Sequence, residues 1–225
     1  MASKTSDIEL KLVSGRSVRA ALARPAAVEA PGLLLIHEWW GLNDEMRAVA
    51  ARMADAGFLA LAVDLFEGAV ANEPAGARAL MTGLDAAKAT ETMTGWAGWM
   101  RSDAGCNGKV GALGFCMGGG WALNTALATP LEAAVIFYGN CNKSAGELAP
   151  LKGPVQGHFG RLDQGIPVAM AEGFREALKT AGKPGEIHIY EANHAFARIG
   201  GPNYHQPSAD LAWKRTFEFL QKNLG

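Results

Sequence analysis

Short apolar runs alternate along the chain with longer segments in which apolar positions recur at helical spacing. The runs predict strands at residues 8–12, 17–23, 32–36, 58–63, 109–113, 133–138, 155–160 and 186–190. The segments between them predict helices at about 44–56, 73–100, 118–128, 168–181 and 208–223, with Asn43 or Asp44 as the cap of the first. Glycines at 83, 95 and 98 argue against one unbroken helix over 73–100.

The order of these elements predicts an α/β fold with a mostly parallel, doubly wound sheet. The first two strands alternate around Ser14 and Gly15, which predicts an antiparallel hairpin at the start. A chain of 225 residues with 49% hydrophobic content fits a single domain over 1–225. Ligands of such sheets bind beyond the carboxyl ends of the strands. We therefore expect the active site on the loops that follow the strands.

Charge is nearly balanced, with 21 Lys and Arg against 22 Asp and Glu. There is no basic excess for the phosphates of nucleic acid or for an anionic membrane, so we expect neither partner. The first seven residues are polar, without the apolar stretch of a signal peptide, and no later run is long enough to span a bilayer. We expect a cytoplasmic protein, and no motif indicates a metal or an organic cofactor.

The three cysteines, Cys106, Cys116 and Cys141, are too few for a disulfide scaffold, and none belongs to a CxxC pair. An odd number leaves at least one thiol free. A free cysteine is usually a small buried apolar residue, and we interpret Cys106 and Cys141 in this way because neither lies in a glycine elbow.

Cys116 stands in a different context, the segment Gly114-Phe115-Cys116-Met117-Gly118. It follows a predicted strand and opens a predicted helix, which is typical of a nucleophile elbow with sulfur in place of oxygen. Glycines suit the strained turn and the close approach of helix and strand, and the positive end of the helix favours the thiolate. The alternative is a buried cysteine in a phosphate-binding turn. That interpretation lacks both the GxGxxG spacing and the Lys-Ser/Thr of a P-loop.

An acid and a histidine follow the elbow in the order that this type of fold uses. Asp163 comes after the strand 155–160, and His194 comes after the strand that ends near Tyr190. We predict that Cys116 is the nucleophile, that His194 takes its proton and later activates water, and that Asp163 orients the imidazole.

The other histidines suit this role less well. His158 and His188 lie inside predicted strands, which indicates packed side chains. His205 lies in a polar loop and is expected on the surface. His37 ends its strand and could line the site without acting as the base.

Glu38 follows a buried strand and precedes Trp39-Trp40-Gly41, so a carboxylate is expected beside apolar surface at the carboxyl end of the sheet. A helix-capping or solvated acid is the alternative. The backbone N–H groups of Trp39 and Met117 are the expected oxyanion donors, since this fold uses the residue after the nucleophile and one in the first crossover loop.

Four further residues are candidates for substrate binding. Arg198 lies four residues past His194, where its guanidinium could bind a carboxylate in bidentate fashion, although a surface arginine fits the spacing almost as well. Arg78 could play the same part, but its surroundings indicate only a polar helix. Trp40 and Tyr138 are expected to line the site.

Four segments together resemble the dienelactone hydrolases (carboxymethylenebutenolidases) of the α/β-hydrolase superfamily, and the resemblance covers nearly the whole chain. They are His37-Glu38-Trp39-Trp40-Gly41-Leu42-Asn43, Gly114-Phe115-Cys116-Met117-Gly118-Gly119, Gly160-Arg161-Leu162-Asp163 and His194-Ala195-Phe196-Ala197-Arg198.

The resemblance implies an α/β-hydrolase fold and a Cys-His-Asp triad at Cys116, His194 and Asp163. It also implies a glutamate, matching Glu38, that helps to ionise the thiol when substrate binds. Arg198 matches a carboxylate-binding arginine of the family, and Arg78 matches a second one loosely.

A cysteine nucleophile also restricts the substrate. A thiolate leaves a tetrahedral intermediate more readily than an alkoxide does, so simple alkyl esters should turn over slowly. Enol lactones, aryl esters and thioesters have more stable leaving groups, and a dienelactone-type enol lactone is the expected substrate. The alternatives are a general carboxylesterase or thioesterase, a redox thiol protein in which Cys106 or Cys141 resolves Cys116, and a binding module that has lost its activity.

Overall fold

The computed structural model describes residues 3–225. Met1 and Ala2, the first of the polar residues that were predicted not to form a signal peptide, lie outside the described residues. The chain divides into two compact units between Ala112 and Leu113. Strand β5 (Cys106–Phe115) runs through this division.

The strands of the first unit form the predicted hairpin and the beginning of the parallel sheet. Their order is β1-β2-β4-β3, followed by β5. β1 pairs with β2 and β2 with β4 in antiparallel fashion, whereas β3 and β4 are parallel. The bounds are Thr5–Lys11 for β1, Ser17–Ala23 for β2, Ala30–Ile36 for β3 and Leu59–Val63 for β4. All five residues of β4 are buried, as expected for a strand covered on both faces.

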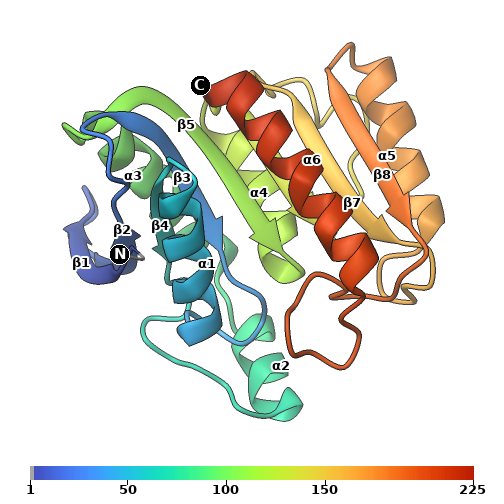
Figure 1. Ribbon diagram of the computed structural model, residues 1–225, viewed down its shortest axis with the longest axis horizontal. Helices are drawn as coiled ribbons and strands as arrows, with labels where there is room; N and C mark the ends of the chain where they lie inside the picture. Colours follow the sequence, from blue (N-terminus) through green and yellow to red (C-terminus); the bar gives the residue numbers. More distant parts are fainter. Residues whose placement is uncertain (1–2) are drawn as a thin grey trace. The chain divides into compact units, whose positions relative to one another are not determined.

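The first unit contains helices α1 (Asp44–Asp55), α2 (Pro74–Thr82) and α3 (Ala86–Ser102). The side chain of Asn43 caps α1 by accepting a 3.1 Å hydrogen bond from the N–H of Met46. In Figure 1, α1 lies in front of β3 and β4, and α3 lies behind them.

The stretch 73–100 is divided into two helices, as its glycines suggested. Gly83 ends α2, and Asp85 begins α3 by accepting from the N–H groups of Ala87 and Lys88. Gly95 does not interrupt α3, because its missing side chain lets the helix approach Leu12, whose Cδ2 a Cβ at position 95 would overlap.

The second unit continues the sheet in the order β5-β6-β7-β8, with β6, β7 and β8 parallel. Figure 1 shows α6 crossing in front of β7, while α4 lies behind the strands. The strands are β6 (Ala133–Phe137), β7 (Val155–Gly160) and β8 (Gly185–Tyr190), and the helices are α4 (Met117–Ala128), α5 (Val168–Thr180) and α6 (Gln206–Leu224). The mostly parallel sheet with an amino-terminal antiparallel hairpin confirms the predicted fold class.

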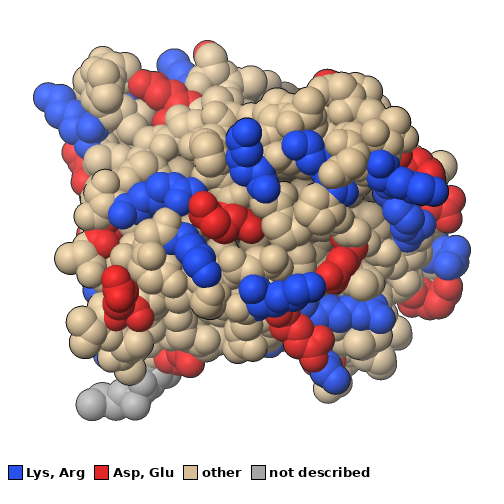
Figure 2. Space-filling model, turned by 90° about the horizontal axis from the view of Figure 1, so that it is seen from above, with Lys and Arg blue, Asp and Glu red and all other residues tan. Residues whose placement is uncertain are grey.

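Charged side chains of both signs lie together on one face of the protein (Figure 2). On the face drawn in Figure 2, Lys and Arg side chains alternate with Asp and Glu, which agrees with the formal net charge of −1. Within residues 3–225, no helix is both long enough and apolar enough to cross a membrane.

Candidate active site

Cys116 lies in the sharp turn between β5 and α4. Its φ angle is 52°, in the left-handed region that residues other than glycine rarely adopt, and it is the residue before the first turn of α4. Its N–H donates to the carbonyl of Phe137 at 2.9 Å, and its carbonyl accepts from the N–H of Gly119 at 3.0 Å. The strained strand-turn-helix geometry expected of an elbow is therefore present, with the sulfur partly exposed.

Glycines make this turn possible because backbone meets backbone around it. A Cβ at Gly114 would overlap the carbonyl of Gly118. A Cβ at Gly119 would lie 2.9 Å from the Cα of Gly139, in the loop after β6. The first turn of α4 thus packs directly on the end of β6. Met117 is the first residue of α4, so its N–H has no partner within the helix.

Asp163, His194 and Cys116 form a continuous chain of short contacts. His194 Nδ1 lies 2.6 Å from Asp163 Oδ2, and His194 Nε2 lies 3.1 Å from Cys116 Sγ. The other carboxylate oxygen of Asp163 accepts from the N–H groups of Gly165 and Ile166 at 2.8 and 2.9 Å. The structure therefore brings together three residues that are separated by 31 or more positions in the sequence.

The electrostatics of this chain favour a protonated imidazole. Burial lowers the pKa of His194, but its hydrogen bonds to Asp163 and Cys116 and the charges of these two groups outweigh burial and raise that pKa to about 10. Burial raises the pKa of Asp163, but hydrogen bonds from His194 and from two backbone N–H groups lower it by more, so the net shift is a decrease. A carboxylate and an imidazolium next to a sulfur atom can stabilise a thiolate and move a proton at Nε2.

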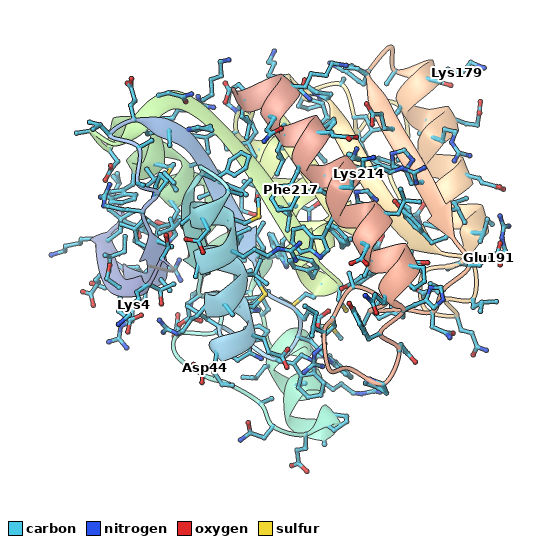
Figure 3. All side chains as sticks on the ribbon, viewed as in Figure 1. Lys4, Asp44, Lys179, Glu191, Lys214 and Phe217 are labelled. Carbon is cyan, nitrogen blue, oxygen red and sulfur yellow. The ribbon has the colours of Figure 1, made fainter. Side chains whose placement is uncertain are left out.

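The loop that carries Asp163 and the loop that carries His194 are joined beyond the ends of β7 and β8. The N–H of Arg161 donates to the carbonyl of Tyr190 at 2.7 Å, and that of Leu162 to the carbonyl of Ala192 at 3.0 Å. The Arg161 guanidinium also pairs with Glu191 at 2.5 Å, just past the end of β8 (Figure 3). These bonds extend the β7–β8 ladder, whose last pair is Gly160 with Tyr190.

Tyr138, expected to line the site, is almost completely buried, with 1% of its surface exposed. Its φ angle is 40°, and its ring lies 5.1 Å from that of His194 and 5.5 Å from that of Phe196. Phe196 in turn contacts Tyr190 at 5.1 Å. Neither Phe196 nor Tyr190 was among the residues predicted to line the site. Their positions could have indicated this, because Tyr190 ends β8 and Phe196 lies in the loop that follows it.

His158 is fully buried in β7, as expected for a packed histidine. The Gln156 amide donates from Nε2 to Glu186, so its Oε1 accepts from His158 Nε2–H at 2.9 Å. The Nδ1 of the neutral ring then accepts from the Tyr190 hydroxyl at 2.8 Å. His188 is partly buried, 3.6 Å from Glu186.

His205 precedes α6 on the surface, where its Nδ1 is 2.8 Å from Ser208 Oγ. Cys106 and Cys141 are buried free thiols, and burial raises the pKa of Cys141 to about 12.

The remaining candidates after β3 and on α2 belong to the first unit. His37 is fully buried, and it donates from Nδ1 to the carbonyl of Glu38 at 2.5 Å and accepts at Nε2 from the N–H of Leu65 at 3.1 Å. Glu38 is 8% exposed. The partly exposed rings of Trp39 and Trp40 meet edge to face at 5.2 Å. Arg78 lies on the exposed side of α2.

Arg198 belongs to the second unit, in the loop between β8 and α6 (dark orange in Figure 1), and is partly buried. Its N–H donates to the carbonyl of Ala195 at 3.1 Å. Across the part of the chain that the structure describes, no group of three or more His, Cys, Asp or Glu side chains is arranged to hold a metal ion.

Comparison with known proteins places these features in a family. The family model of the dienelactone hydrolase family matches residues 18–224. A Saccharolobus solfataricus protein assigned as a carboxymethylenebutenolidase is 30% identical, over 92% of this chain and 95% of its own length. The carboxymethylenebutenolidase of Pseudomonas putida is 28% identical, over 96% of both chains.

Solved structures agree with the sequence comparison. The crystal structure of a Klebsiella pneumoniae protein assigned as a dienelactone hydrolase superposes with a TM-score of 0.85 at 27% identity, over 96% of this chain and 98% of that one. The match of the family model to almost the whole chain, together with relatives of similar length and the same fold, shows that this protein belongs to the dienelactone hydrolase family, a group of α/β-hydrolases that act on ester and lactone bonds.

Proposed function

We propose that the protein hydrolyses an activated carboxylic ester, a dienelactone-type enol lactone, through a thioester on Cys116. The observation that carries this proposal is the chain of contacts from Asp163 Oδ2 to His194 Nδ1, at 2.6 Å, and from His194 Nε2 to Cys116 Sγ, at 3.1 Å. A nucleophile, a base and an orienting acid in this order form the constellation that acyl transfer requires.

The proton shared by the sulfur and the imidazole moves to His194 when the nucleophile forms. A pKa of about 10 keeps this imidazole protonated at neutral pH. Asp163 accepts from Nδ1–H and so fixes the ring with Nε2–H directed at the sulfur. Cys116 then attacks as a thiolate, the reactive form of a cysteine nucleophile.

Acylation forms a bond from the sulfur to the carbonyl carbon of the lactone. The oxyanion of the tetrahedral intermediate is stabilised by the N–H of Met117, and we assign the N–H of Trp39 as the second donor. Collapse of this intermediate breaks the ring C–O bond and releases an enolate, which takes the proton from His194 Nε2. The product of the step is a thioester on Cys116 and a neutral imidazole.

Deacylation uses that neutral imidazole as a general base. His194 removes a proton from water, the hydroxide attacks the thioester carbonyl, and Cys116 leaves as a thiolate. The proton on the imidazolium is again shared with the sulfur, which completes the cycle, while the carboxylic acid product departs. Asp163, whose carboxylate is held by two backbone N–H groups, stabilises the imidazolium in both halves of the cycle.

The remaining roles follow the family resemblance. Glu38 assists ionisation of the thiol on substrate binding, Arg198 binds a substrate carboxylate, and Arg78 is a second, weaker candidate for the same contact. Trp40 lines the substrate site. Tyr138 is buried against the His194 ring, which supports a role for it as a wall of the site behind that ring.

Two observations support the substrate class and the compartment. The Pseudomonas putida relative is named a carboxymethylenebutenolidase. A thiolate is acylated efficiently when the leaving group is nearly as stable as the thiolate, and an enolate meets this condition. The three free thiols, one of which must stay reduced to act, favour a reducing compartment such as the cytoplasm.

The test compares hydrolysis of a dienelactone, an aryl acetate and a simple alkyl ester by the wild type and by Cys116→Ala. We expect the wild type to prefer the lactone and to cleave the alkyl ester more slowly by about two orders of magnitude or more. Cys116→Ala should lose both lactone and aryl ester activity. Intact-protein mass spectrometry during turnover should detect an acyl group on the wild type alone. Activity that survives in Cys116→Ala would overturn the mechanism.

Each alternative function predicts a different outcome. Activity on the aryl ester or a thioester without activity on the lactone would assign a general carboxylesterase or thioesterase. A redox thiol protein would form an intramolecular disulfide after mild peroxide, but the burial of Cys141 and its raised pKa make it a poor resolving thiol. We expect no such disulfide by mass spectrometry.

A further inference from the structure

The residue that follows His194 is held in a strained backbone conformation. Ala195 has a φ angle of 60°, in the left-handed region. An L-residue other than glycine populates this region less than the right-handed region by a factor of roughly 5 to 30. It persists only where the surrounding structure imposes it. Something in the loop after His194 must therefore hold this peptide.

The side chain of Asn203 makes a bond to that peptide. Its Nδ2 donates to the carbonyl of His194 at 3.0 Å, and because the partner is a carbonyl oxygen, the amide must present its nitrogen here. Asn203 itself is exposed and lies nine residues further along the chain, shortly before α6.

The loop between the two residues closes on itself. The N–H of Arg198 donates to the carbonyl of Ala195 at 3.1 Å, and the N–H of His205 donates to the carbonyl of Phe196 at 3.0 Å. Phe196 is fully buried. The Asn203 amide is therefore presented from a closed loop whose base is anchored in the core.

The ring of His194 is fixed at the same time by Asp163 on Nδ1 and by Cys116 on Nε2. The left-handed turn at Ala195 lies between this ring and the anchored Phe196. A change of φ and ψ at Ala195 must therefore move one of the two, and His194, which is 32% exposed, is the one with room to move.

We propose that Asn203 is a positioning residue of the active site: its amide holds the carbonyl of His194, and through it the left-handed turn at Ala195 that aims Nε2 at the sulfur of Cys116. Without this bond, Ala195 relaxes toward the right-handed or extended region, and Nε2 moves away from the sulfur. The sulfur then loses the contact that stabilises its thiolate and reacts more slowly with an electrophile. The inference rests on the proposed roles of Cys116 and His194.

A substitution in the turn should compensate for the loss of the Asn203 bond. Glycine adopts positive φ about as readily as negative φ, so Ala195→Gly removes the strain that the Asn203 bond offsets. If Asn203 acts by holding the turn, its loss should matter with alanine at 195 and much less with glycine there. A residue that contacts substrate, or that only stabilises the fold, would not show this dependence.

The experiment uses Asn203→Ala, Ala195→Gly and the double variant, with Asn223→Ala as a matched control. Asn223 makes the same kind of bond, from Nδ2 to the carbonyl of Phe219 at 2.7 Å, near the end of α6. The readouts are kcat and KM for the hydrolysed ester, and the rate at which iodoacetamide alkylates Cys116 as a function of pH.

We expect Asn203→Ala to lower kcat about fivefold, the lower end of the cost of the strained turn, and to lower the rate at which iodoacetamide alkylates Cys116. KM should change by less than about twofold, since no substrate contact is lost. Ala195→Gly and Asn223→Ala should resemble the wild type. The double variant should recover to within about twofold of Ala195→Gly, which is the non-additivity that a shared turn requires.

Wild-type kcat and alkylation in Asn203→Ala would overturn the positioning role. So would a deficit that Ala195→Gly leaves unchanged, or a rise in KM alone, which would indicate a substrate contact. Failure of the proposed function is separate, because it appears as activity that survives in Cys116→Ala. An inactive Cys116→Ala together with an unaffected Asn203→Ala would overturn the positioning role alone.

Discussion

The ionisation of His194 depends on its two neighbours more than on its burial. Burial alone would favour the neutral ring, yet the hydrogen bonds and charges of Asp163 and Cys116 raise the pKa of His194 to about 10. Asp163 can exert this effect because its own pKa stays low, with a second oxygen held by the N–H groups of Gly165 and Ile166. The acid thus acts through the charge it provides as well as through orientation.

Asp163→Asn should therefore change both the rate and its pH dependence. The neutral amide no longer stabilises the imidazolium, and we expect kcat to fall by about 10²-fold or more. Because Asp163 raises the pKa of His194, its loss lowers that pKa, so the alkaline limb of kcat/KM should move from near pH 10 to lower pH. A pH–rate profile of both proteins measures this. An alkaline limb that does not move would show that Asp163 does not set the charge of His194.

At the scale of elements, the loops after β7 and β8 behave as a continuation of the strands. Two backbone hydrogen bonds and the Arg161–Glu191 ion pair join them beyond the last ladder pair. Gly160 allows this approach, because a Cβ there would overlap the carbonyl of Ala192 and lie 2.9 Å from that of Asn193. The distance between acid and base is therefore set by backbone contacts as well as by the hydrogen bond between their side chains.

Gly160→Ala should separate the two loops and lower kcat by about tenfold or more, since displacing a base by a fraction of an ångström is costly. The matched control is Gly157→Ala in the same strand. A Cβ at position 157 meets side chains, at 2.5 Å from Phe159 Cε2 and 3.0 Å from Ile187 Cδ1, and these can shift without moving the loops. We expect Gly157→Ala to lower the denaturation midpoint while kcat stays within about threefold of the wild type.

Kinetics and urea denaturation of the two variants provide the test. Equal losses of kcat in both would mean that the strand as a whole is disturbed, and that Gly160 has no particular role in positioning the base.

At the scale of the whole molecule, β5 belongs to both compact units. Its first residues continue the order of the first unit, and its last residues begin that of the second and lead into Cys116. Neither unit can complete its set of strands without this element, so we propose that residues 1–225 unfold as the single domain expected from the length of the chain.

Urea unfolding should show one transition, coincident by far-UV circular dichroism and by tryptophan fluorescence, with a calorimetric enthalpy equal to the van't Hoff enthalpy. Tryptophans occur in both units, at Trp96 and Trp213 among others, so fluorescence reports on each. Two separated transitions would show that the units unfold independently.

Local periodicity and spacing determined most of the fold. The expected strands and helices agree with the observed ones to within a few residues, because apolar runs and capping residues such as Asn43 act through near neighbours. The elbow could also be predicted, since glycines around a cysteine between strand and helix are a local requirement of that turn. The sequence predicted that the stretch 73–100 is divided, but it did not predict that the division lies at Gly83, because Gly95 and Gly98 carry the same local signal.

What the sequence by itself determined is the class of fold, the residue types of the candidate triad and their order. Only the tertiary structure decided the contacts between residues far apart in the chain: the charge of His194, the burial of Tyr138 behind it, and the bond from Asn203 that holds its peptide. The physical reason is that periodicity and turn chemistry depend on neighbours within a few residues. Desolvation, pKa shifts and backbone strain depend on which distant groups the fold brings within a few ångströms.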